Sequence, residues 1–90
     1  MLLRQTFAAL TDDHRRHIID LLKEREMNAG QIGTHLDITA PSLSHHLKIL
    51  KNAGMISDRR HGQEIIYSLN VSVIKELSQT ILKFLKYNKK

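Results

Sequence analysis

The sequence predicts a mainly α-helical fold with one β-hairpin, in the order of four helices, a two-stranded hairpin and a C-terminal helix. Apolar residues recur at helical spacing before residue 53 and after residue 70. Between them, residues 55–60 and 63–69 are rich in strand-forming side chains and flank His61-Gly62, a pair typical of a hairpin tip. The 90 residues are about the length of one small domain. We therefore expect residues 1–90 to form a single domain.

The first two helices are predicted from spacing and capping. Leu3, Phe7 and Leu10 recur at positions i, i+4 and i+7, which places them on one face of a short helix. Thr11 or Asp12 is expected to cap a second helix, because their side-chain oxygens can accept from free backbone amides. The buried stripe of that helix would consist of Ile18, Leu21 and Leu22.

The third and fourth helices are predicted close together in the chain. Asn28 is a plausible cap for a third helix over residues 29–36. A short connection then leads to Pro41, and proline is favoured in the first turn of a helix, so the fourth helix is expected to begin near residue 40. Gly54 is expected to end it with a positive φ. The buried side of the fourth helix would contain Leu43, His46, Leu47 and Leu50.

The last predicted element is a long amphipathic helix over residues 71–87, capped by Asn70 or Ser72. Its apolar residues recur at helical spacing and are Ile74, Leu77, Ile81, Phe84 and Leu85. This is more apolar surface than a domain of this size is expected to bury alone, so a second copy of the chain is a plausible partner.

The charge distribution favours a polyanion as the partner of the second half of the chain. The net charge is +5, of which −1 falls on residues 1–38, +2 on residues 39–70 and +4 on residues 71–90. A short helix, a tight turn and a second helix with a polar outer face form a helix-turn-helix, whose second helix fits the major groove of DNA. On that outer face, serines can bond bases or phosphates and Lys48 and Lys51 can neutralise phosphates. Arg59, Arg60 and His61 at the hairpin tip would form a basic wing.

The same residues resemble a known family. The block S-x-S-H-H-L-x-x-L-x-x-A-G at residues 42–54, followed by R-x-G-Q-x-x-x-Y at residues 60–67, is similar to the ArsR family of winged-helix repressors. The resemblance extends over nearly the whole chain. It implies a homodimer that binds double-stranded DNA at an inverted-repeat operator, in its own or a neighbouring promoter, and blocks transcription.

The resemblance also assigns residues. It implies that Ser42, Ser44 and His45 on the fourth helix reach the groove and that Arg59, Arg60 and Gln63 in the wing contact the backbone or minor groove. With Lys48, expected from its charge to contact phosphate, these are the expected DNA-binding residues. Family members pair through their first and last helices, and the expected dimer interface therefore contains Leu3, Phe7, Ile74, Leu77, Ile81 and Phe84.

The chain departs from the family at its usual metal-sensing sites. Where many relatives carry a cysteine pair on the third helix, residues 27–31 read Met-Asn-Ala-Gly-Gln, and the chain has no cysteine. The aspartate and histidines of the other common site are absent from residues 71–90. We therefore expect no metal or other cofactor and no small-molecule substrate. Resemblance to one subgroup implies release from DNA by a membrane protein that sequesters the repressor.

The sequence also allows other functions. His14 and His17 lie three residues apart and could chelate a metal with Asp13 or His35, which would make a metal-responsive repressor. A winged helix can also serve as a protein-binding module. No nucleophile with a base and orienting group is recognisable, so we expect no enzyme.

Without a long apolar run or a signal sequence, a cytoplasmic location is expected. Protonation of His45 or His61 near about pH 6 would add charge at the DNA surface and tighten binding.

Overall fold

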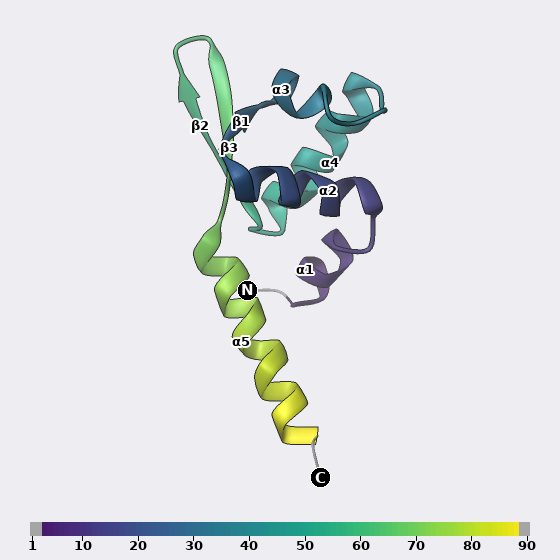
Figure 1. Cartoon of the computed structure of the whole chain (residues 1–90), viewed down its shortest axis with the longest axis vertical. Coiled ribbons are helices and arrows are strands. Elements are labelled where there is room, and N and C mark those ends of the chain that lie inside the picture. The colour runs from purple at the N-terminus through teal and green to yellow at the C-terminus, as the bar shows by residue number, and fades with distance from the viewer. Residues whose placement is uncertain (1–2, 89–90) are drawn as a thin grey trace.

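The computed structural model describes residues 3–88 and has the predicted architecture, with one strand added (Figure 1). Short helices α1 (Leu3–Ala9) and α3 (Ala29–Gly33) pack with the longer α2 (Asp13–Glu24) and α4 (Ala40–Asn52). Strands β2 (Ile56–His61) and β3 (Glu64–Leu69) form the hairpin, and α5 (Val71–Asn88) follows. The helix-turn-helix consists of α3 and α4, and the hairpin is its wing.

The sheet has three strands in the order β1-β3-β2, whereas the sequence predicts two. The additional strand β1 (Met27–Asn28) pairs antiparallel with β3, where Met27 faces Tyr67. It was missed because a two-residue strand has no periodicity of its own. The hairpin turn is formed by Gly62 and Gln63, one residue later than predicted, because His61 still pairs with Glu64. Gly62 supplies the positive φ of 64° in this turn.

Capping confirms most of the predicted helix starts. Asp12 caps α2 by accepting from the amide of Arg15, and Asn28 caps α3 in a reciprocal arrangement with Gln31. Thr39 caps α4 by accepting from the Ser42 amide at 3.2 Å. The regular part of α3 is shorter than the predicted range, because the chain leaves the α-helix after Gly33 and turns toward Leu36.

One apolar core joins all these elements. It contains the buried faces of α2 and α4, with Met27 of β1, Ile56 of β2 and Leu77 of α5. Beyond Leu77, α5 extends away from the rest of the chain (Figure 1), and the molecule measures 52 × 25 × 22 Å. Exposed apolar side chains therefore gather on the far half of this helix, where Leu82, Phe84 and Leu85 are 59–66% exposed. None of the helices in residues 3–88 is long and apolar enough to cross a bilayer.

Gly54 ends α4 with a φ of 76°, as predicted, and this yields a stability prediction. Gly54→Ala should lower the free energy of unfolding by about 1 to 2 kcal/mol, because a Cβ is strained in the left-handed region. Gly33→Ala is the matched control, since its Cβ would meet only the Leu43 Cδ2 at 3.6 Å, an ordinary contact. Urea denaturation should show the loss for Gly54→Ala alone; equal losses in both variants would contradict the assignment.

Candidate nucleic-acid interface

The exposed side of α4 is polar and cationic, and the opposite side is buried. Leu43, His46, Leu47 and Leu50 are the buried residues of this helix, with His46 only 8% exposed. Ser44, His45 and Lys48 are exposed, and Ser42 is half-buried in the first turn. The sequence predicted this division between the two sides, including the packing role of His46. The exposed side can therefore approach a ligand without disturbing the core.

A hollow of about 200 Å³ lies between α4 and the wing. At its edge the Lys51 Nζ donates to the Asp58 Oδ2 at 2.9 Å, which joins the helix to strand β2. This hydrogen bond to Asp58, together with the attraction between the two charges, raises the pKa of Lys51. The other lining residues are Ser44, Leu47, Lys48 and Tyr67. The ion pair fixes the wing beside the polar side of α4, so the two elements form one continuous surface.

The wing arginines lie on opposite faces of the hairpin. The pairing of β2 with β3 is regular from Ile56 to His61, so successive side chains alternate between the faces. Arg60 is on the same face as Asp58, which contacts α4. Arg59 is on the other face and donates to the Glu26 Oε1 at 2.6 Å. Of the two arginines, only Arg60 extends the cationic surface of α4, while Gln63 is exposed in the turn.

The expected dimer residues are only partly on the surface. Phe7 of α1 and Ile81 and Phe84 of α5 surround an apolar hollow of about 250 Å³, which Thr80 also lines. Ile74 is half-buried and packs against the core, and Leu77, 5% exposed, belongs to the core itself. The side chain of Leu3 lies outside the described residues. The apolar surface open to a second copy is therefore the far half of α5 and the adjoining side of α1.

The predicted pairing of His14 and His17 with a third metal ligand is not seen in the part of the chain described. Within residues 3–88, no three histidine, aspartate or glutamate side chains lie close enough together to hold a metal ion. His14 instead approaches His46, with ring centroids 5.7 Å apart. His17 is exposed on α2.

A match to a known protein family identifies the family of this chain. The family described as bacterial regulatory protein, arsR family, matches residues 12–58, the segment from the cap of α2 to the middle of β2. The chain belongs to the ArsR family. Its fold, a winged helix-turn-helix, agrees with the prediction from sequence.

Individual ArsR-family relatives support this membership. The chain is 48% identical to the transcriptional repressor SdpR of Bacillus subtilis, over 92% of each protein. The resemblance to one subgroup, which residues 42–47 and the cysteine-free composition carry, is confirmed by this identity. An ArsR-like regulator from Rhodococcus superposes with a TM-score of 0.86 at 25% identity, covering 94% of this chain and 80% of that one.

A homodimeric member of the family is also similar. The winged helix-turn-helix DNA-binding domain of a possible ArsR-family regulator from Mycobacterium bovis superposes with a TM-score of 0.74 at 25% identity. The match covers 98% of this chain and 85% of the other. That domain is homodimeric in solution.

Some residues of the surface were not predicted from the sequence. Asp58 and Tyr67 line the hollow beside α4, and Glu26 holds Arg59 from a position 33 residues away. Asp58 could have been found, because strand alternation places it on the face of Arg60. No signal in the sequence indicates the pairing of Glu26 with Arg59, since neither residue type requires the other.

Proposed function

We propose that this protein is a sequence-specific DNA-binding transcriptional repressor that acts as a homodimer on an inverted-repeat operator. One observation carries the proposal: the exposed side of α4 and the Arg60 face of the wing form a single cationic surface. In it, α4 inserts into the major groove, which is about 12 Å wide and admits one helix. Ser44 and His45 contact base edges, while Ser42 and Lys48 contact phosphates.

The dimer positions two copies of α4 on one side of the duplex. The apolar surface of Phe7, Ile81 and Phe84 supports pairing through α1 and α5, as does the homodimeric relative. Two recognition helices of a symmetric dimer enter successive major grooves, which lie about 34 Å apart along the DNA. The operator is therefore an inverted repeat with half-site centres about 10 base pairs apart.

Protection of the promoter upstream of its own gene tests this function. We expect the wild-type protein to protect one palindromic segment at sub-micromolar concentration, with a periodicity of about 10 base pairs. Uniform protection along the promoter, or none at all, would count against a sequence-specific repressor.

The proposal has no metal or small-molecule effector and places the protein in the cytoplasm. We also propose that a membrane protein sequesters the repressor and so releases it from DNA. Capture of the protein by vesicles that contain such a partner, with loss of operator binding, would test that step.

The two wing arginines provide a prediction within the same surface. Arg60→Ala should weaken binding to the operator and to random duplex alike, and reduce the slope of log affinity against log salt by about one unit. Arg59→Ala is the matched control, since Arg59 pairs with Glu26 on the other face and should change both affinities by less than about two-fold. Fluorescence anisotropy at several salt concentrations measures both quantities. A larger loss from Arg59→Ala, or a change in base preference from Arg60→Ala, would overturn this division of roles.

A further inference from the structure

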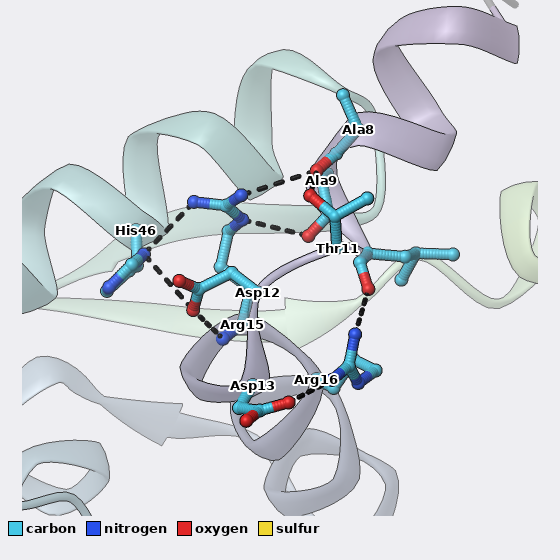
Figure 2. Close-up of polar contacts among 9 residues, drawn as sticks. Ala8, Ala9, Thr11, Asp12, Asp13, Arg15, Arg16 and His46 are labelled. Atoms are coloured by element: carbon cyan, nitrogen blue, oxygen red, sulfur yellow. Dashed lines mark hydrogen bonds and ion pairs between the residues drawn. The ribbon is translucent and has the colours of Figure 1, made fainter.

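Arg15, near the start of α2, connects three helices through one guanidinium group (Figure 2). Its Nε donates to the Ala9 carbonyl at 2.8 Å and its Nη2 to the Ala8 carbonyl at 3.3 Å, at the end of α1. Its Nη1 lies 3.2 Å from the Nδ1 of His46, in the middle of α4. The last carbonyls of a helix have no partner within the helix. Arg15 supplies a donor to the Ala9 carbonyl and shares the Ala8 carbonyl with the amide and hydroxyl of Thr11, while it also contacts α4.

The contact with α4 requires a neutral histidine. A guanidinium group has only donors, so the Nδ1 of His46 must be the acceptor and carry no hydrogen. The charged and titratable groups around the His46 ring are Asp12, His14 and Arg15 of the α2 start and His45 of α4. The neighbouring end of α1 contributes the two alanine carbonyls.

The surroundings of His46 keep it neutral. Burial lowers the pKa of His46 below the ordinary 6.5; the Asp12 carboxylate opposes this, while Arg15, His14 and His45 add to it. For Asp12, burial raises the pKa, but the hydrogen bond from the Arg15 amide and the positive charges of Arg15 and, once it is protonated, of His46 outweigh burial, so the pKa is lowered. Asp12 therefore stays ionised, with its Oδ1 3.8 Å from the His46 Nδ1.

These contacts join the two functional surfaces of the molecule. Phe7, which lines the apolar dimer surface, lies directly before the two alanines whose carbonyls Arg15 holds. On α4, His46 lies directly after Ser44 and His45. We propose that Arg15 is a positioning residue for DNA recognition, which fixes the recognition helix α4 to the dimer-forming helix α1 through neutral His46. The inference rests on the proposed function.

Protonation of His46 would open this connection. A charged ring cannot accept from Arg15 and repels it, while the ionised Asp12 at 3.8 Å offers the ring an alternative partner. As the pH falls through the lowered pKa of His46, α4 therefore loses its link to α1. Operator affinity should therefore fall as this link opens.

A substitution series separates positioning from mere charge. Arg15→Lys keeps the charge but loses the planar fork that reaches both helices. We expect about ten-fold weaker operator binding, with random-duplex affinity and the dimer dissociation constant within about two-fold of wild type. Arg16→Lys is the matched control, because Arg16 donates to the Leu10 carbonyl directly after α1 and pairs with Asp13, neither of which belongs to α4. Equal losses in the two variants would overturn the proposal.

The pH profile supplies a test that a purely structural role would not affect. His46→Gln keeps an oxygen that can accept from Arg15 but cannot be protonated. Its operator affinity should equal that of the wild type near about pH 8 and exceed it several-fold once the pH has fallen through the lowered pKa of His46, since all other groups are common to both proteins. A constant ratio of the two affinities over this range would contradict the role of His46. If Arg15→Lys fails to fold, the comparison of His46→Gln with the wild type still tests the proposal, because it leaves Arg15 in place.

The failure of this inference can be distinguished from failure of the proposed function. Nitrogen NMR of the histidine rings needs no DNA. It should show the His46 Nδ1 as an unprotonated acceptor whose signal moves in Arg15→Lys and stays unchanged in Arg16→Lys. If the NMR result is obtained but the wild type does not bind an operator, the proposed function is rejected and the connection of α4 to α1 through Arg15 stands. Operator binding with no difference between the two variants would reject only the connection.

Discussion

Ile81→Asp is expected to split the dimer and remove tight operator binding. Ile81 lies in the apolar hollow with Phe7 and Phe84, 38% exposed in the single chain. Packing a second copy there would bury the new carboxylate without a partner, which costs several kcal/mol. A monomer engages one half-site, so operator affinity should fall by about 100-fold or more. Sedimentation at micromolar concentration measures the first effect and anisotropy the second.

Gln79→Asp is the matched control for this substitution. It introduces the same charge two residues away on α5, where Gln79 is exposed and borders Glu76 and Lys83 rather than Phe7. We expect it to remain a dimer and to bind the operator with nearly wild-type affinity. A dimeric Ile81→Asp protein, or a monomeric Gln79→Asp protein, would show that the copies pair through another surface.

The combined substitution Ser44→Ala with His45→Ala should have the second largest effect. Both side chains are exposed on α4, and the His45 ring lies 6.0 Å from the ring of His46. If they contact base edges, their removal should cost about 1 to 3 kcal/mol on the operator and much less on random duplex. Competition between the two DNAs measures the difference directly.

Lys48→Ala provides the contrast on the same helix. A phosphate contact carries no sequence information, so this variant should lose affinity for both DNAs and show a smaller salt slope. If the double variant behaves like Lys48→Ala, then Ser44 and His45 do not read bases, and specificity resides elsewhere on the surface.

Sequence was sufficient for the parts of this fold that depend on local chemistry. The helix starts at Asp12, Asn28 and residue 40 follow from capping side chains that act within a few residues. The left-handed conformations of Gly54 after α4 and of Gly62 in the hairpin turn follow from the lack of a Cβ. The buried and exposed sides of α4 follow from its periodicity in the same way.

The contacts that arrange the surface of α4 and the wing were harder to predict from the sequence. The pairings of Glu26 with Arg59 and of Arg15 with His46 connect residues more than 30 positions apart, and each partner is also plausible alone at the surface. Leu77 belongs to the same stripe as Ile81, but the path of α5 places the first in the core and the second in the open hollow. Periodicity identifies a face of a helix and not the molecule that covers it.

The affinity ratio between operator and random duplex, measured by titration at two salt concentrations, tests the central claim most directly. A dimer that reads DNA with α4 should prefer its operator by at least about 10³-fold, and both affinities should fall steeply as salt rises. Equal affinities for the two DNAs, or binding that salt leaves unchanged, would contradict the claim that the exposed side of α4 recognises a DNA sequence.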